Sequence, residues 1–365
     1  MSGTVGDNAG RGSGVIAPAG TGATVSASDP TVSTNPLSVG AEWINSTSGE
    51  VWICTDITAG ENVWKSTGPH SSGTVQPAPV FVGGTGLFGA GDTSGSGGYT
   101  DIVDYVTISS LGNATDFGDL TVGRDAESCA SSGSKGLWAG GYIGSSTVSN
   151  VIDLVVISSI GNATNFGDLT EARQGVTAVG DGTKAVIAGG YSNSCSCTKD
   201  VIDYVTVESV GDAADFGNLT NSRWANAGVA SETRGVFMGN ATTMDYITIA
   251  SLGDATDFGD LTQNGGGAGG CSNGIRGVAG GFSGGDANYI EYITISSVGN
   301  AADFGNRTTT GYGVAACSDG TKGLFGGGTG TVNIIDYVNI MSVGDAADFG
   351  DMTTTRYSLS GCSGD

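Results

Sequence analysis

The chain contains one motif in six copies, and this repeat restricts the possible folds more than any other feature. In the last copy the motif runs from Ile334 to Ile340 and continues from Gly344 to Thr353, with a Phe-Gly pair near its end. The Phe of this pair recurs in steps of 49, 50, 42, 46 and 45 residues, at Phe117, Phe166, Phe216, Phe258, Phe304 and Phe349. A period of this length is typical of solenoids, propellers and other repeat arrays.

Each copy of the repeat reads as four short strands. In the last copy these are residues 314–318, 323–328, 334–340 and a segment around 347–353. Short strands separated by turn residues and repeated in tandem predict antiparallel four-stranded blades. Glycines in the second strand and β-branched residues in the third disfavour a helical alternative.

The two ends of the repeat region predict how the array closes. The first copy begins at the second strand, residues 86–91, and its own first strand is doubtful. The last copy is followed by residues 356–362, which read as a first strand with no second strand after it. We therefore expect the C-terminal strand to complete blade one, which removes two open sheet edges. The predicted fold is all-β, with a six-bladed β-propeller over residues 80–365.

Three segments of different composition precede the repeats. Residues 1–35 are rich in Gly, Ser and Thr, and we expect a flexible arm or one that orders only against a partner. Residues 36–68 contain three of the five tryptophans and carry a hairpin pattern from Glu42 to Cys54. So short a module has little core of its own, so we expect it to pack on a neighbour or in an oligomer. Residues 69–79 read as a linker.

The charge and the cysteines exclude several classes of partner and site. A net charge of −23 with only 13 Lys and Arg argues against nucleic acid and against an anionic membrane surface. No apolar run is long enough to span a membrane, and residues 1–14 do not resemble a secretory signal. We expect all seven cysteines to be free thiols in a reducing cytoplasm, with Cys271, Cys317 and Cys362 buried in strands. Cys195 and Cys197 form only a weak metal-binding pattern.

Acidic residues recur at three positions of the repeat. Oxygen ligands at short spacing around a glycine are compatible with Ca²⁺, whereas Asp and Asn also cap turns through backbone N–H groups. The second interpretation is favoured, and no metal site is predicted. The columns are Asp104, Asp153, Asp203, Asp245, Glu291 and Asp336; Asp116, Asn165, Asp215, Asp257, Asp303 and Asp348; and Asp119, Asp168, Asn218, Asp260, Asn306 and Asp351.

A basic residue stands before the second strand of most copies. An anion site on one face is one interpretation, and a solvated turn residue that pairs with an Asp of the neighbouring blade is the favoured one. The residues are Lys135, Lys184, Arg234, Arg276 and Lys322.

The loops between the second and third strands vary most between copies, and they share one rim of the predicted ring. Aromatic residues with Ser, Asn and Asp suit carbohydrate or protein recognition, although unconstrained surface loops would look similar. The candidate ligand-binding residues are Tyr99, Tyr142, Tyr191, Phe282 and Tyr289.

Several of these features together resemble the kelch repeat. The shared pattern is an Asp-Gly turn, a second strand that ends in Gly-Gly, an aromatic residue in the fourth strand and an Arg after it. Gly-Gly pairs occur at residues 140–141, 189–190, 280–281 and 326–328. The Arg is matched by Arg124, Arg173, Arg223 and Arg356, and blades four and five lack it. This resemblance covers residues 80–365 and supports the fold more than a function.

The near-identical tandem form, as in residues 105–118, also resembles propellers in structural proteins of tailed bacteriophages of marine and cyanobacterial hosts. Residues 41–68 are similar to small β modules of phage tail and fibre proteins. The resemblance implies a virion structural protein made in the host cytoplasm, in a tail fibre or appendage, as a homo-oligomer. Residues 1–76 would bind other virion proteins, with Trp43, Trp52 and Trp64 as anchoring residues. The propeller would mediate adhesion to a host-surface glycan or protein.

Two other functions remain open at this point. The propeller could be architectural and dock on neighbouring tail or capsid proteins, or the chain could be a non-viral kelch-like scaffold. An enzyme is not predicted, and no catalytic residue or cofactor is assigned. The single histidine, His70, lies outside the repeats, and a catalytic carboxylate pair should break the six-fold pattern.

Overall fold

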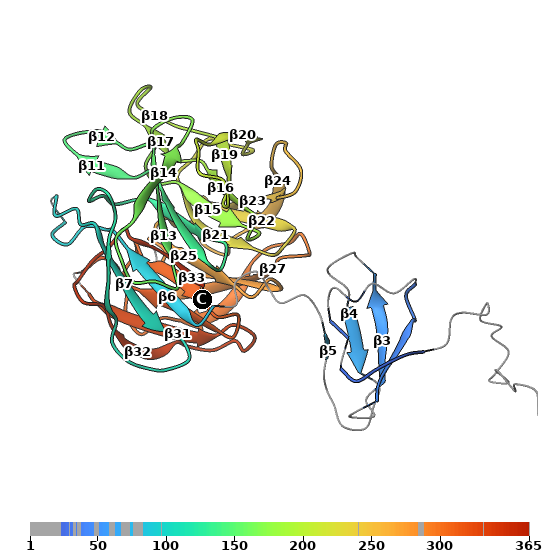
Figure 1. Cartoon of the computed structure of the whole chain (residues 1–365). Helices are drawn as coiled ribbons and strands as arrows, with labels where there is room; N and C mark the ends of the chain where they lie inside the picture. The colour runs from blue at the N-terminus through green and yellow to red at the C-terminus, as the bar shows by residue number, and fades with distance from the viewer. Residues whose placement is uncertain are drawn as a thin grey trace, which may run out of the picture. The chain divides into compact units, whose positions relative to one another are not determined.

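A computed structural model describes residues 23–364 except 29, 32–33, 35–37, 47–50, 58–62, 67–73, 76–82, 96, 240, 284–287 and 331. As predicted, the fold is all-β: these residues form strands and turns and no helix (Figure 1). The described part of the chain therefore has no helix that could cross a membrane. The chain divides into two compact units, Met1–Ala78 and Pro79–Asp365.

The first unit is one five-stranded sheet in the order β1-β2-β3-β4-β5. The predicted hairpin is present, because β2 pairs antiparallel with β3 and Trp43 stands opposite Trp52. The strands are β1 (Thr24–Ser26), β2 (Glu42–Asn45), β3 (Val51–Asp56), β4 (Val63–Ser66) and β5 (Thr74–Val75).

Two strands of this sheet lie in segments for which no strand was predicted. β1 belongs to the predicted arm and pairs parallel with β2, and β5 belongs to the predicted linker and pairs with β4. Both are edge strands held by backbone hydrogen bonds, which composition alone does not reveal. The sheet has a small core of its own, in which Trp52, Cys54 and Trp64 are buried.

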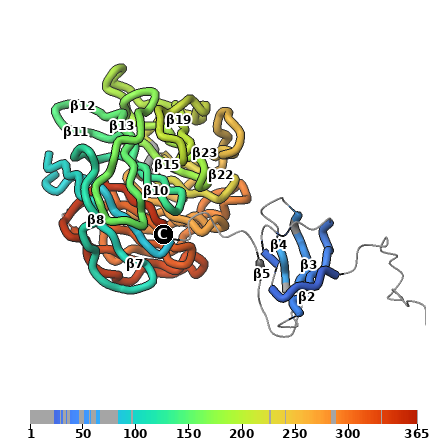
Figure 2. Tube along the Cα trace, viewed as in Figure 1, coloured from blue at the N-terminus to red at the C-terminus, as the bar shows by residue number. Residues whose placement is uncertain are grey.

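The second unit contains six four-stranded antiparallel sheets. Figure 2 follows the chain through this unit from β6 to the C-terminus. The strands of the six sheets follow the four predicted in each copy. Sheet 1 is β33 (Ser360–Gly364), β6 (Thr85–Gly89), β7 (Ile102–Thr107) and β8 (Thr115–Asp119); sheet 2 is β9 (Ser128–Ser131), β10 (Lys135–Ala139), β13 (Val151–Val156) and β14 (Thr164–Asp168); sheet 3 is β15 (Thr177–Gly180), β16 (Lys184–Ala188), β19 (Val201–Thr206) and β20 (Ala214–Asn218).

The remaining sheets follow the same order. Sheet 4 is β21 (Ala225–Ala230), β22 (Arg234–Gly239), β23 (Thr243–Thr248) and β24 (Thr256–Asp260); sheet 5 is β25 (Gly269–Ser272), β26 (Arg276–Gly280), β27 (Tyr289–Thr294) and β28 (Ala302–Asn306); sheet 6 is β29 (Ala315–Ser318), β30 (Lys322–Gly326), β31 (Ile334–Asn339) and β32 (Ala347–Asp351). Two short hairpins stand between second and third strands: β11 (Tyr142–Gly144) with β12 (Thr147–Val148), and β17 (Tyr191–Ser192) with β18 (Cys197–Thr198).

Sheet 1 combines the two ends of the repeat region. The C-terminal strand β33 pairs with β6 along its whole length, with Cys362 opposite Leu87. This confirms the predicted pairing of the last strand with the first copy. The pairing gives β6 a partner on each side, so it is not an exposed edge.

The second strand of each sheet is buried on both faces because neighbouring sheets pack against it. In β30, both Leu324 and Phe325 are fully buried although their side chains point to opposite faces. The neighbouring sheet comes so close that a Cβ on Gly326 would lie 2.8 Å from a ring carbon of Phe88. Glycine at this position therefore serves close packing between sheets.

The first strands lie side by side in the order β9, β15, β21, β25, β29 and β33, and β33 also lies beside β9. Serine hydroxyls at the ends of these strands link neighbours. Ser131 donates to the carbonyl of Ser363, Ser363 to that of Ser318, Ser318 to that of Ser272, and Ser272 to that of Ala230.

The outer strands make an equivalent series of contacts. The fourth strand of each sheet binds the turn between the third and fourth strands of the next sheet, and the series returns from sheet 6 to sheet 1. There the N–H of Gly112 donates to the carbonyl of Phe349 at 3.0 Å, and Asn113 accepts from the N–H of Asp351 at 3.1 Å. Gly350 has a φ of 153°, and a Cβ on it would lie 2.3 Å from the oxygen of Gly112, so only glycine fits.

Candidate functional site

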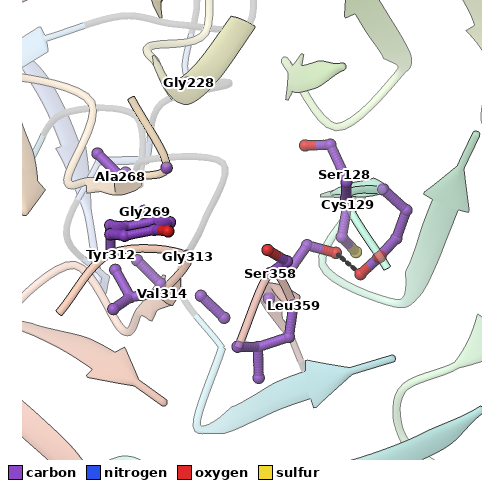
Figure 3. Close-up of a pocket in the computed structure, with 18 of the residues that line it drawn as sticks. Ser128, Cys129, Gly228, Ala268, Gly269, Tyr312, Gly313, Val314, Ser358 and Leu359 are labelled. Carbon is purple, nitrogen blue, oxygen red and sulfur yellow. Dashed lines mark hydrogen bonds between the residues drawn. The ribbon is translucent and has the colours of Figure 1, made fainter. Parts of the chain in front are cut away.

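A cavity of about 270 Å³ lies where the first strands of the six sheets begin (Figure 3). Every sheet contributes to its wall. Representative lining residues are Glu127, Val176, Gly228, Ala268, Val314 and Leu359. Because the wall has one segment from each copy, residues that depart from the repeat give the cavity its chemical character.

Backbone hydrogen bonds between sheets hold the mouth of the cavity. The second residue before the first strand has a positive φ in five copies: Ala126, Gly175, Gly267, Gly313 and Ser358. In four of them its N–H donates to the carbonyl of its counterpart in the preceding sheet, as from Gly175 to Ala126 at 2.7 Å and from Ala126 to Ser358 at 2.9 Å. These bonds fix the spacing of neighbouring sheets around the opening.

Two aromatic side chains line the same cavity. The Tyr312 ring packs over Gly267, whose Cβ would lie 3.0 Å from the ring, and Tyr312 is 43% exposed (Figure 3). Trp224 is held between Gly175 and the ring of Tyr191, on which it stacks at 5.8 Å. Tyr191 begins the variable loop of sheet 3, so the cavity adjoins the variable-loop face.

Glu127 is the residue of the wall that departs most from the repeat. Four other copies carry Val176, Ala268, Val314 and Leu359 at its position. Its side chain is buried, with the residue 5% exposed, and its Oε1 accepts a hydrogen bond from Ser360 Oγ at 3.0 Å. Its Oε2 has no hydrogen-bond partner among the described residues. Burial raises the pKa of this carboxyl to about 8.

The charged groups near Glu127 are arginines that already pair with an Asp, or are themselves acidic. The charge of Arg124 lowers the pKa of Glu127, although burial outweighs it. Arg124 is itself paired with Asp153, and Arg356 with Asp104, so neither guanidinium forms an ion pair with Glu127. Desolvation and then the charge of Asp92 raise the pKa of the neighbouring Asp125 carboxyl to about 7. Glu127 was not among the predicted site residues, although a single carboxylate in a column of apolar residues is a signal that the sequence contains.

The five predicted rim aromatics do not form one site. Tyr99 and Tyr142 contact each other edge to face at 5.3 Å. Tyr191 stacks on Trp224 beside the cavity. Phe282 and Tyr289 stack on each other at 4.8 Å and are buried, at 1% and 5% exposure, so they are core residues and the prediction of a ligand-contacting role is wrong for both.

The reason for this burial is a missing arginine. Gly265 occupies the position of Arg173 and Arg223, and its Cβ would lie 2.9 Å from Phe282 and 3.1 Å from the Tyr289 hydroxyl. The two rings thus fill space that a guanidinium occupies elsewhere. Burial raises the pKa of Tyr289 to about 12.

The first acidic column is structural. Each of its carboxylates accepts a hydrogen bond from the hydroxyl of a Thr in the neighbouring sheet, and five of the six also accept one from the backbone N–H of that Thr, as Asp203 does from Thr170 at 2.6 and 3.2 Å. Most also pair with a buried Arg, as Asp203 does with Arg173 at 2.6 Å. These contacts favour the turn-capping interpretation. Among the described residues no group of three His, Cys, Asp or Glu is placed to hold a metal ion.

One Asp of the first acidic column pairs with an Arg at a position that the repeat pattern did not predict. Gly311 stands where the Arg is expected, but Arg307, four residues earlier, pairs with Asp336 at 3.0 Å. It occupies the place of Leu120 in the first copy, and its guanidinium reaches the same carboxylate. A long flexible side chain can thus replace the missing residue from the adjacent turn.

The basic column does not pair with neighbouring Asp residues as predicted. Four of its members lie over the Tyr of the third strand in their own sheet, as Arg234 does over Tyr246 at 4.4 Å. They donate to backbone carbonyls of the next sheet, as Arg234 does to Ile295 at 2.9 Å. The fifth, Lys135, pairs with Glu208 at 2.6 Å. The acceptors are carbonyls because the backbone of the turn after the third strand of the next sheet lies beside these basic side chains.

The prediction that all cysteines are free is wrong for two of them. Cys195 and Cys197 form a disulfide within the turn of the β17–β18 hairpin, where their Cα atoms lie 5.2 Å apart. The tight turn brings the side chains together, which the spacing alone does not show. The other five are free and buried, which confirms the strand positions predicted for Cys271, Cys317 and Cys362.

The predicted anchoring tryptophans belong to the sheet of the first unit. Trp52 and Trp64 are buried in its core, and Trp43 is partly buried with its ring 6.1 Å from that of Trp64. Trp43 Nε1 donates to the carbonyl of Ser28 at 2.8 Å. Of the three, only Trp43 keeps exposed surface that a partner could contact.

No family model matches this chain, and no curated protein matches it.

Proposed function

We propose that Pro79–Asp365 is a six-bladed, kelch-like β-propeller that serves as a recognition module of a bacteriophage virion appendage. The support for the propeller is the cyclic order of contacts, in which β33 pairs with β6 and lies beside β9 while the outer turn of sheet 1 binds β32. Six four-stranded sheets packed face to face in such an order match the blades of this architecture.

The observation that carries a binding function is the cavity whose wall comes from all six sheets. It adjoins the variable loops, combines aromatic and polar groups, and includes Glu127, a buried carboxylate at a position where other copies carry apolar residues. Ligand sites are concave and mostly apolar, with a few placed polar groups. The ligand is a glycan of the host surface, and the module acts by adhesion without catalysis.

The first unit attaches the protein to other virion proteins through residues 1–76, and the protein is a homo-oligomer in the virion. Trp43 is the tryptophan that takes part in this contact, since Trp52 and Trp64 stabilise the sheet from inside. The strongly acidic surface keeps neighbouring copies apart and soluble in a crowded particle.

The test is binding of the full-chain protein to intact cyanobacterial and other marine bacterial cells. Half of each cell sample is first oxidised with periodate, which cleaves vicinal diols of sugars. We expect saturable binding to at least one cell type that is lost after oxidation. Binding that survives oxidation contradicts a glycan ligand, and no binding to any cell contradicts adhesion.

A second candidate function is architectural, and one observation favours it. The turn between the third and fourth strands exposes an aliphatic side chain in every copy: Leu111, Ile160, Val210, Leu252, Val298 and Val343. Single exposed apolar residues are common on protein surfaces, but the same turn of all six sheets carries one here, so a neighbouring virion protein would meet six equivalent apolar contacts. Here the propeller would dock on a neighbouring virion protein, and co-purification with particles in the absence of cell binding would favour this alternative.

A further inference from the structure

We propose that the cavity shared by the six sheets binds one neutral monosaccharide residue, and that the carboxyl group of Glu127 donates a hydrogen bond to an oxygen of that sugar. This inference rests on the proposed adhesion to glycans, and it specifies the surface and the ligand class. It moves the ligand from the rim aromatics, two of which are buried, to the centre of the unit.

The unsatisfied oxygen of Glu127 indicates where a ligand would bind. Buried polar atoms are almost always hydrogen-bonded, because an unpaired one costs about 1–3 kcal/mol. Glu127 Oε1 has Ser360 as a partner, whereas Oε2 has none among the described residues and is covered by neighbouring atoms. The Glu127 side chain belongs to the wall of the cavity, so a small rotation of the carboxyl group would bring Oε2 to a ligand oxygen and satisfy it.

The charges around the cavity select a neutral ligand. Its described wall contains no Lys or Arg, and the chain has a net charge of −23, so an anion would be repelled. A carboxyl with a pKa of about 8 is mostly uncharged at neutral pH, so it offers no counter-charge to a cation. In this state it is a hydrogen-bond donor, and hydroxyl or ring oxygens of sugars are suitable acceptors.

The size and the remaining wall fit a single sugar ring. A volume of about 270 Å³ is just below the range of roughly 300–1,000 Å³ that holds drug-sized ligands. Small residues such as Ala268 and Gly269 leave the space open, and the Tyr312 ring supplies an amphipathic surface at the edge (Figure 3). Hydroxyls of Ser128 and Ser360 add polar contacts on the side of Glu127.

Charged and titratable groups face Glu127 from its own segment and from the segment before β33. Arg124 and Asp125 precede it on its own segment, Cys129 follows it in β9, and Arg356 lies on the segment before β33. Burial raises the pKa of Asp125 to about 7, and it raises the pKa of the Cys129 thiol well above its usual value. A pH effect on binding is therefore assigned to Glu127 only by comparison with a variant at that residue.

The experiment uses the full-chain protein and ligand-observed NMR with methyl glycosides of glucose, galactose, mannose and N-acetylglucosamine as probes. Glucuronate and choline serve as anionic and cationic probes. The variants are Glu127→Val, which copies Val176 of the next repeat, Glu127→Gln, which keeps a donor, and Glu208→Gln as an exposed control. Binding to cells is measured in parallel.

We expect at least one neutral glycoside to bind the wild-type protein. Its affinity for Glu127→Val should be lower by about tenfold or more, whereas its affinities for Glu127→Gln and Glu208→Gln should stay within about threefold of wild type. Wild-type affinity falls as the pH rises through about 8, whereas that of Glu127→Gln stays constant between pH 6 and 9.

Three results would overturn this inference: no glycoside binds, Glu127→Val binds as wild type does, or choline binds more tightly than the glycosides with an affinity that increases with pH. If cells still bind in a periodate-sensitive manner in any of these cases, the proposed adhesion stands and its site lies elsewhere. If cells do not bind but a glycoside does, the adhesion proposal fails while the cavity site is retained.

Discussion

The carboxyl of Glu127 lies buried at a position where the neighbouring copy has Val176, and only one of its two oxygens is hydrogen-bonded within the described residues. Such a residue lowers stability at neutral pH, because folding must either desolvate a charge or take up a proton. A stability cost kept at a single position of a repeat is typical of a functional residue. The same comparison between copies could have identified Glu127 from sequence.

Replacing this carboxyl should change how stability depends on pH. Its pKa is about 8 in the folded chain against an ordinary 4.5, so the folded state binds the extra proton. The stability associated with this group is fully present below about pH 4.5 and is lost as the pH rises through about 8. Glu127→Val should therefore be more stable than wild type at pH 8, by on the order of a few kcal/mol.

The measurement is urea denaturation of both proteins at pH 5 and pH 8, with Glu208→Gln as the exposed control. We expect the gain of Glu127→Val to be larger at pH 8 than at pH 5. An equal gain at both values would mean that the carboxyl does not carry a raised pKa in the folded chain.

The buried ion pairs act at the same scale. Arg173 and Asp203 are both fully buried, so removal of the Arg leaves an uncompensated charge. We expect Arg173→Met to destabilise the chain by about 3–5 kcal/mol, and the additional change Asp203→Asn to restore part of the loss. Lys135→Met, which breaks the exposed pair with Glu208, should cost less than about 1 kcal/mol. Urea denaturation checks all three, and equal costs for the buried and exposed pairs would contradict this account.

At the scale of elements, the repeat pattern predicted the four strands of each sheet, because strand length, turn residues and glycines recur in register. The repeat pattern did not predict elements that are held by backbone pairing alone, or ion pairs with a residue outside the expected position. β1 and β5 are held by edge pairing, and Arg307 reaches Asp336 from an unexpected position. The cavity itself could not be predicted, since its wall joins short segments from six copies that only the fold brings together.

The disulfide in the β17–β18 hairpin belongs to this scale. Cys195 and Cys197 close a very short loop, so we expect their joint replacement by Ser to cost roughly 2 kcal/mol or less in global stability. Thiol titration of the denatured, unreduced protein should count five thiols, in keeping with the five free cysteines. A count of seven would show that the hairpin forms without the bond.

At the scale of the whole molecule, the C-terminal strand connects the two ends of the repeat region. β33 supplies the first strand of sheet 1, buries Cys362 against Leu87, and lies beside both β29 and β9. The sequence indicated this pairing because the first copy has no clear first strand and the last copy has one to spare. The contact joins residues that are over 270 positions apart, so we expect it to form later in folding than the local hairpins.

Deletion of residues 358–365 tests the importance of this contact. It leaves β6 without its neighbour and removes the buried Leu359 and Cys362, so we expect a loss of about 5 kcal/mol or more and a tendency to aggregate. A synthetic peptide of residues 356–365 should raise the melting temperature of the truncated chain again. If the truncated chain melts like the full chain and ignores the peptide, the strand does not complete sheet 1.

The central claim is that the cavity shared by the six sheets recognises a host sugar, and the most direct measurement compares wild type and Glu127→Val on the same cells. Binding isotherms of the two full-chain proteins are recorded side by side, after circular dichroism has shown that both are folded. We predict saturable wild-type binding and an affinity of Glu127→Val that is lower by about tenfold or more. Identical isotherms for the two proteins would contradict the claim.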